Sequence, residues 1–248
     1  MQYIILDLEF NQPFDFPTGK KSILEPACPF EIIQIGAVKL SENLEMTGHA
    51  NFLVKPQLYR RIHPYVEKMT SLNMKILDQE RTFPDVYADF VQFAGNEKNV
   101  FGLWGSGDIS ALFKNILYYN LNTKLITKKF VNIQALTSSF LRLPGERSIG
   151  LKNAVEALKI ESLLPFHDAL NDAIYTAMIF RLVNHPNISV QTFNLSQMKQ
   201  KTLAADAKVN RNLLFNFSER ALGKKLNDKE KELVLKVYNA GQSNMFKQ

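Results

Sequence analysis

Residues 3–9 read Tyr3-Ile4-Ile5-Leu6-Asp7-Leu8-Glu9, an apolar run interrupted near its end by two carboxylates. The run predicts a short buried β-strand. Asp7 and Glu9 are two positions apart, so in a strand both side chains leave the same face. Neighbouring carboxylates repel each other and lose hydration on burial unless a cation compensates their charge. This end of the strand is therefore the first candidate for a functional site.

The rest of the chain supplies the elements that surround this strand. Three strands in succession, followed by alternating helices and strands, indicate an α/β domain with a mixed five-stranded sheet flanked by helices. A loop rich in Pro, Phe, Gly and Lys is expected over residues 11–29. The other predicted strands cover residues 30–39, 50–54, 99–104 and 130–133, and the predicted helices cover 84–94, 109–119, 134–141, 149–158 and 169–182.

The C-terminal part differs in composition. We expect a domain over residues 1–185, followed by a linker and a basic helical extension over 186–248. The formal net charge of the chain is +6, and all of it comes from residues 199–248, which hold 11 Lys and Arg against 5 Asp and Glu. Asn227, with Glu230 three residues later, predicts the start of a last helix, and Gly241 predicts its end. The extension is a candidate surface for a homodimer or another protein.

Composition excludes several classes of protein. No apolar run approaches the roughly 18 residues needed to cross a bilayer, so we expect no membrane partner. The first residues lack a basic leader, which argues against a signal peptide. Cys28 is the only cysteine, which excludes an intramolecular disulfide and a zinc cluster with several thiolates. The expected location is the cytoplasm.

Two further acids and a histidine stand at informative places. Asp108 follows the predicted strand over 99–104 at the head of a helix, and Asp172 lies in the helix over 169–182, five residues after His167. Each has an ordinary alternative: a helix cap for Asp108, an exposed helical position for Asp172, and a surface histidine for His167. Asp168 is expected to cap its helix. Oxygen ligands of this kind select Mg²⁺ or Mn²⁺, and two such ions can support phosphodiester hydrolysis.

Four segments of the chain combine these acids and the histidine with characteristic neighbours. They are Ile5-Leu6-Asp7-Leu8-Glu9-Phe10, Glu31-Ile32-Ile33-Gln34-Ile35-Gly36-Ala37-Val38, Trp104-Gly105-Ser106-Gly107-Asp108 and His167-Asp168-Ala169-Leu170-Asn171-Asp172-Ala173. Together they resemble the DEDDh exonucleases, the DnaQ-like group. The resemblance spans about residues 1–185 and implies an RNase H-like fold. The Phe after Glu9 and the Trp-Gly before Asp108 are similar to the RNA-trimming ERI-like branch.

The resemblance implies roles for these residues. Asp7, Glu9 and Asp172 would hold a first metal ion, with Asp7 bridging to a second ion to which Asp108 contributes. His167 would be the general base, and Phe10 and Leu72 would contact the substrate. Relatives of the tyrosine type carry Tyr four residues before the last Asp, where this chain has Asp168, and Tyr175 lies on the other side of Asp172. Gln34 stands where many relatives carry Glu, and it is not a signature ligand.

The sequence therefore predicts a 3′→5′ exonuclease that uses two divalent ions, Mg²⁺ or Mn²⁺, to remove nucleotides from the 3′ end of single-stranded RNA or DNA. Two alternatives stay open. One is a nucleic-acid-binding or polymerase-accessory module with an RNase H-like fold. The other is an RNase H-type endonuclease, because a fold alone does not fix an activity.

Overall fold

A computed structural model describes residues 2–14, 27–144, 148–198 and 211–242. Most of the loop expected over 11–29 lies outside the described residues, as do Lys199, Lys201 and Lys208 of the basic extension. The chain divides into two compact units, Met1–Leu195 and Ser196–Gln248, and each is described by itself.

The first unit is built on a six-stranded sheet, one strand more than expected. The order of the strands is β3-β2-β1-β4-β5-β6. β1 pairs antiparallel with β2 and parallel with β4, so it occupies the centre of the sheet. The additional strand, β6, has two polar residues, shows no alternating pattern, and exists because it pairs with the edge of β5. The bounds are β1 Tyr3–Asn11, β2 Glu31–Leu40, β3 Met46–Leu53, β4 Val100–Leu103, β5 Lys129–Asn132 and β6 Gln191–Thr192.

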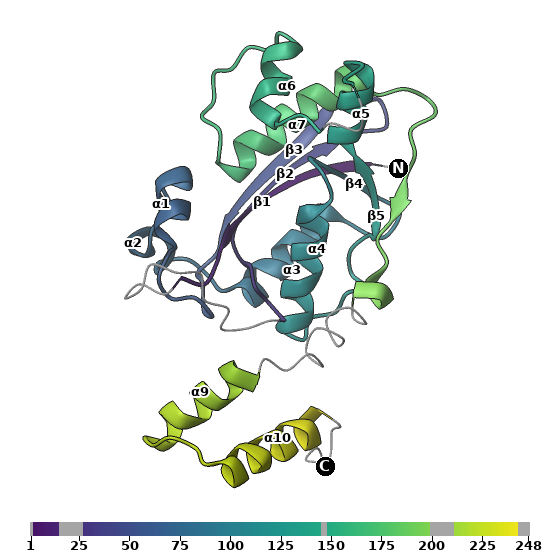
Figure 1. The fold of residues 1–248 in the computed structure, drawn as a ribbon. Helices are drawn as coiled ribbons and strands as arrows, with labels where there is room; N and C mark the ends of the chain where they lie inside the picture. The colour runs from purple at the N-terminus through teal and green to yellow at the C-terminus, as the bar shows by residue number, and fades with distance from the viewer. Residues whose placement is uncertain (1, 15–26, 145–147, 199–210, 243–248) are drawn as a thin grey trace. The chain divides into compact units, whose positions relative to one another are not determined.

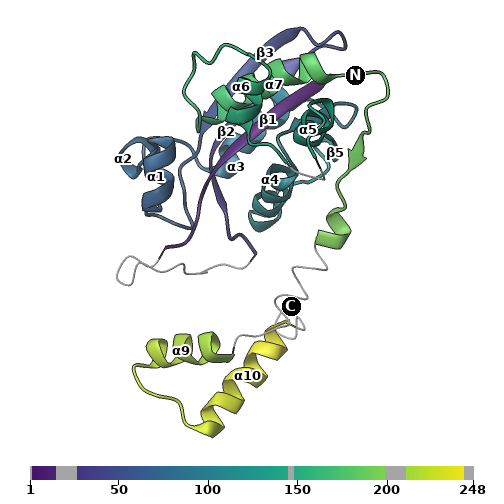
Figure 2. The same cartoon turned by 45° about the horizontal axis from the view of Figure 1, so that its top comes forward.

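Helices cover both faces of this sheet. α5, α6 and α7 lie on one face, and α3 and α4 lie on the other (Figures 1 and 2). The α/β fold class is confirmed, although two short helices, α1 and α2, were not expected. The bounds are α1 Pro64–Thr70, α2 Met74–Leu77, α3 Phe83–Ala94, α4 Gly107–Tyr118, α5 Ile133–Phe140, α6 Leu151–Ala157 and α7 Ala169–Val183.

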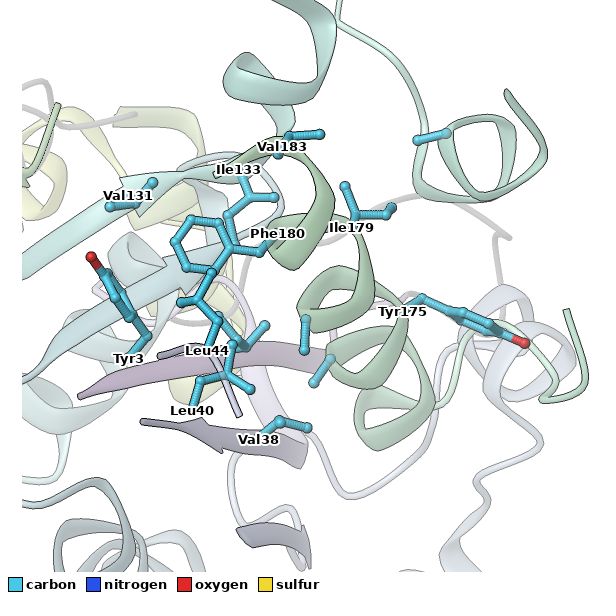
Figure 3. Close-up of a cluster of buried hydrophobic side chains, with 14 of the residues drawn as sticks. Tyr3, Val38, Leu40, Leu44, Val131, Ile133, Tyr175, Ile179, Phe180 and Val183 are labelled. Atoms are coloured by element: carbon cyan, nitrogen blue, oxygen red, sulfur yellow. The ribbon is translucent and has the colours of Figure 1, made fainter. Parts of the chain in front are cut away.

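The core on the α7 side of the sheet determines which way the acids of β1 point. Tyr3 and Ile5 of β1 belong to the buried cluster that includes Phe180 of α7, and the Tyr3 and Phe180 rings meet edge to face at 5.0 Å (Figure 3). Because side chains alternate along a strand, Asp7 and Glu9 follow on the same face as Tyr3 and Ile5. The two acids therefore continue the α7 side of the sheet beyond its apolar core.

The described part of the second unit includes the helices α9 (Arg211–Leu222) and α10 (Asp228–Gln242). The predicted cap of α10 is confirmed: Asn227 Oδ1 accepts a hydrogen bond from the Glu230 N–H at 3.0 Å, and Glu230 Oε2 accepts one from the Asn227 N–H at 2.9 Å. The predicted end at Gly241 is wrong, since α10 continues to Gln242. Within the described ranges, no helix combines the length and apolarity that crossing a bilayer requires.

Candidate active site

Asp7 and Glu9 lie in the last part of β1, next to the antiparallel strand β2. Asp7 pairs with Gly36, and Glu9 pairs with Gln34. The register shifts between Glu9 and Phe10, after the second acid. Both carboxylates therefore precede the irregularity and keep the common face that their spacing predicts.

Gly36 permits α7 to approach β2 closely. A Cβ atom at Gly36 would lie 2.0 Å from the carbonyl carbon of Ala169 and 2.2 Å from the backbone nitrogen of Leu170. Real Cβ atoms do not approach backbone so closely, so any other residue here would displace the helix from the strand. Because glycine has no side chain, the first turn of α7 can lie against the sheet beside Asp7.

Asp168 begins α7, as expected of a helix cap. Its Oδ1 accepts a hydrogen bond from the Asn171 N–H at 3.0 Å. Its Oδ2 accepts one at 2.8 Å from the side-chain amide of Gln34, and Gln34 Oε1 accepts one at 3.2 Å from the Ala169 N–H. Gln34 is only 1% exposed. Sequence reasoning noted Gln34 as a non-ligand position but missed that it joins β2 to the start of α7.

Asp172 lies one turn into α7 and is 8% exposed. Its Oδ2 accepts a hydrogen bond from the His167 N–H at 3.1 Å. Its buried Oδ1 has no hydrogen-bond partner among the described residues. A buried carboxylate oxygen without a partner is rare in folded proteins and calls for an explanation such as an ion. The exposed helical alternative for Asp172 is therefore wrong.

The structure brings the separated acids and the histidine together. One ligand atom from each of Glu9, His167 and Asp172 lies within 4.8 Å of the other two. Asp108 sits in the first turn of α4, whose N-cap is Ser106, so Asp108 is not the cap. The negative charges of Asp108, Asp172, Glu9 and Asp168 all act on Asp7. These residues form a single electrostatic cluster at the end of β1.

Burial and mutual repulsion raise the pKa values of these acids. Burial, followed by the charges of Asp108 and Asp172, raises the pKa of Asp7 well above its usual range. Burial and neighbouring carboxylates raise the pKa of Glu9 to about 8, and burial raises the pKa of Asp108 to about 7. Burial raises the pKa of Asp172 to about 6, against the opposing effect of the His167 N–H. The cluster is thus poorly neutralised by the protein itself.

This donor set fits divalent cations. Four carboxyl groups supply hard oxygen ligands, the type that Mg²⁺ and Mn²⁺ prefer. A nearby cation would give the unpartnered Oδ1 of Asp172 a partner. It would also lower the raised pKa values of Asp7 and Glu9. The residues present are therefore suited to hold metal ions.

The two expected substrate contacts occupy different environments. Phe10 is partly exposed at the end of β1, with its ring centroid 6.2 Å from that of Phe30. Leu72 is 8% exposed and packs in an apolar cluster with Ile33, Val66 and Leu77. The structure thus gives Leu72 a packing role, whereas Phe10 offers accessible surface close to Glu9.

A family model described as exonuclease, RNase_T, matches residues 4–180, which contain Asp7, Glu9, Asp108, Asp172 and His167. The chain belongs to this exonuclease family. The family assignment confirms the resemblance to the DEDDh exonucleases and the prediction of a nuclease. A search of curated protein sequences gave no significant match.

Solved structures of exonucleases share the fold. The nuclease domain of 3′hExo, described as a DEDDh family member bound to rAMP, is 20% identical, with 77% of this chain and 97% of that chain covered and a TM-score of 0.65. Pop2p of S. pombe, in a form with bound Mg²⁺ and Mn²⁺, is 20% identical, with coverage of 75% and 83% and a TM-score of 0.54. Exonuclease X, in complex with 5′ overhanging duplex DNA, is 16% identical, with coverage of 81% and 99% and a TM-score of 0.51. This exonuclease therefore has the RNase H-like fold.

Proposed function

We propose that the protein is a metal-dependent 3′→5′ exonuclease of the DEDDh type. The observation that carries the proposal is the convergence of Glu9, His167 and Asp172 within 4.8 Å in a chain of the exonuclease family. Asp7 and Asp108 join them electrostatically. The geometry of Glu9, His167 and Asp172, together with the electrostatic coupling of Asp7 and Asp108, supports a single site for the hydrolysis of a phosphodiester bond.

In this proposal the acids hold two divalent ions, Mg²⁺ or Mn²⁺. Asp7, Glu9 and Asp172 would hold the first ion, and Asp7 and Asp108 would hold the second. When bound, such ions activate a water molecule and stabilise the charge on the leaving oxygen. The structure of Pop2p with Mg²⁺ and Mn²⁺ supports the choice of metal.

His167 serves as the general base in this mechanism. Its imidazole takes a proton from the attacking water, the role that histidine most often has in general acid–base catalysis. His167 is exposed, unlike Asp172, so its ring can reach both solvent and a bound nucleotide. Its replacement by Ala should lower kcat about 10²–10⁴-fold.

The proposed substrate is the 3′ end of a single strand, with RNA preferred over DNA. The similar solved structures contain different ligands: 3′hExo was solved with rAMP, and exonuclease X was solved with 5′ overhanging duplex DNA. The preference for RNA rests on the resemblance to the ERI-like branch. Phe10 and the Trp-Gly before Asp108 are the residues that carry this resemblance. Phe10, which is partly exposed, is the proposed substrate contact, whereas the burial of Leu72 in its apolar cluster leaves it a packing role.

A timed digestion tests the proposal. RNA and DNA strands of the same sequence, labelled at the 5′ end, are incubated side by side with Mg²⁺. A ladder that shortens by one nucleotide at a time, and that a 3′-phosphate blocks, is expected. Cleavage of a covalently closed circle would identify an endonuclease instead, and binding without cleavage would identify an accessory module.

A further inference from the structure

The loop that carries His167 is held by side chains of α7. This His loop, residues 161–167, has no regular secondary structure. Asp172 Oδ2 accepts a hydrogen bond from the His167 N–H, and the Asn171 side-chain amide donates one to the Pro165 carbonyl at 3.0 Å. A third anchor, Tyr175, holds the loop near its middle. The first two turns of α7 thus fix the loop at three points.

Tyr175 makes two bonds to one residue of the loop. Its hydroxyl accepts a hydrogen bond from the Leu164 N–H at 2.7 Å and donates one to the Leu164 carbonyl at 2.8 Å. Its ring stacks on Phe166, with centroids 4.8 Å apart. Tyr175 is 1% exposed, and Figure 3 shows it projecting from α7 away from the Tyr3 and Phe180 rings. The ring of Tyr175 thus belongs to the buried cluster on the α7 side of the sheet, while its hydroxyl binds the loop.

The His167 ring depends on its backbone for its position. Among the hydrogen bonds of the described residues, none involves the His167 imidazole; its backbone N–H alone is bound, by Asp172. His167 has a φ of 65°, in the left-handed region that non-glycine residues adopt only when their surroundings impose it. The orientation of the ring is therefore set by the anchors of the loop.

We propose that Tyr175 is a positioning residue that acts through His167: its hydroxyl fixes Leu164 and so holds the His167 ring beside Glu9 and Asp172. The inference rests on the role of His167 in the proposed function. It assigns to the second turn of α7 a task separate from metal binding, because Asp172 would hold an ion while Tyr175 holds the loop that carries the base.

The variant Tyr175→Phe isolates the hydroxyl. It keeps the ring that stacks on Phe166 and removes both bonds to Leu164. Leu164 is 37% exposed, so water can replace the lost partners and the domain should still fold. A shift of the base by about 1 Å can cost about 10²-fold in rate. We expect kcat to fall by about 10- to 100-fold with KM little changed.

Tyr87→Phe is the matched control. Tyr87 of α3 is 3% exposed, and its hydroxyl donates to the Asn122 carbonyl at 2.9 Å, in the loop before β5. The control removes a similarly buried hydroxyl that binds backbone in the loop before β5, whereas the acids lie in β1 and in the first turns of α4 and α7. Its kcat should equal that of the wild type. An equal loss of kcat in both variants would reduce the Tyr175 effect to general destabilisation and overturn the proposal.

A double-mutant cycle with His167→Ala is the decisive measurement. If Tyr175 acts through His167, adding Tyr175→Phe to the His167→Ala enzyme should lower kcat no further. A second loss of the same size in that background would show that Tyr175 acts independently and would overturn the proposal. Hydrogen exchange of the wild-type Leu164 amide gives a test without a variant: protection supports the anchor, and exchange at the rate of a free loop contradicts it.

The outcomes separate this inference from the proposed function. Wild-type kcat in Tyr175→Phe, together with a strong defect in His167→Ala, would remove the positioning role and leave the general base in place. Wild-type kcat in His167→Ala would remove the base itself, and with it the part of the proposed function on which the inference depends.

Discussion

The side-chain amide of Gln34 on β2 donates a hydrogen bond to Asp168 Oδ2 at 2.8 Å, across 134 positions of sequence. Gln34 also donates to Asn51 Oδ1 at 3.0 Å on the neighbouring strand β3. An amide suits this place because it can donate to a carboxylate and at the same time accept the Ala169 N–H. The start of α7 is thus attached to the sheet by a neutral side chain.

Replacing Gln34 with Glu should destabilise the protein in a pH-dependent manner. The new carboxylate would face Asp168 without a donor between them, which raises its pKa above the unfolded value and removes stability as the pH rises through neutrality. A loss of about 1–3 kcal/mol at pH 8 corresponds to roughly 2–12 °C in Tm. Thermal unfolding at pH 5 and pH 8 measures it. Adding Asp168→Asn should restore most of the stability, and an unchanged Tm at pH 8 would contradict the role of Gln34.

The metal-free protein should lose stability as the pH rises from about 4 to about 8. The folded-state pKa values of Glu9, Asp108 and Asp172 are about 8, 7 and 6, against 4.5, 3.8 and 3.8 for the free groups. The folded state therefore binds more protons than the unfolded state across this window, and the free energy of unfolding decreases with pH. In EDTA we expect Tm to fall by at least about 5 °C between pH 5 and pH 8. Saturating Mg²⁺ should reduce the fall, and a Tm that rises with pH in EDTA would disprove the repulsion.

Asp7→Asn should separate activity from stability. Removing the charge that Asp108, Asp172 and Glu9 all repel should raise the metal-free Tm at pH 8 by a few degrees, about 1 kcal/mol or more. It should also lower kcat by at least about 10²–10³-fold, since a group that holds transition-state charge is lost. Asp89→Asn, which breaks only an exposed ion pair with Arg81, is the control and should leave kcat unchanged. A destabilised Asp7→Asn protein would count against the cluster.

Truncation after residue 198 should weaken binding of nucleic acid at low salt and leave kcat at saturating substrate intact. Residues 1–198 hold 19 basic and 19 acidic residues, so the whole formal charge of +6 lies in the extension. If a few of its cations neutralise phosphates, the slope of log K against log salt for a single strand should flatten by roughly two to three units. Fluorescence anisotropy at several salt concentrations measures the slope. An unchanged slope with a lower Tm would make the extension structural.

The sequence predicts those helices and strands in which apolar residues recur at a regular spacing. β1, β2, α3, α4 and α7 lie where apolar spacing places them, within a few residues. α2 and β6 have four and two residues, too short to show any period. The sequence of α9 is polar with scattered Leu and Phe, and none of its residues is buried. Such elements depend on neighbours that the local sequence does not reveal.

The residues of the site are predictable where they form a local pattern and obscure where they depend on distant contacts. The order of the acids and the spacing of His167 and Asp172 are visible in the sequence itself and indicate the candidate ligands. The role of Gln34 depends on Asp168, a partner far away in the sequence. The role of Tyr175 depends on the path of the irregular loop before α7. In the sequence, Gly36 stands out only as part of a motif. The structure explains why glycine is needed at this position, because α7 lies directly against it.

The close approach at Gly36 also determines when this chain can become a nuclease. β1 and β2, with both acids of β1, are synthesised before α7, which follows more than a hundred residues later. Until α7 docks on Gly36, Asp172 and His167 are absent from the site. A chain that ends before α7 therefore carries three of the proposed ligands, Asp7, Glu9 and Asp108, but lacks Asp172 and His167. Nuclease activity is therefore expected only after α7 has been synthesised and has packed against Gly36. Before that point the chain on the ribosome is inactive.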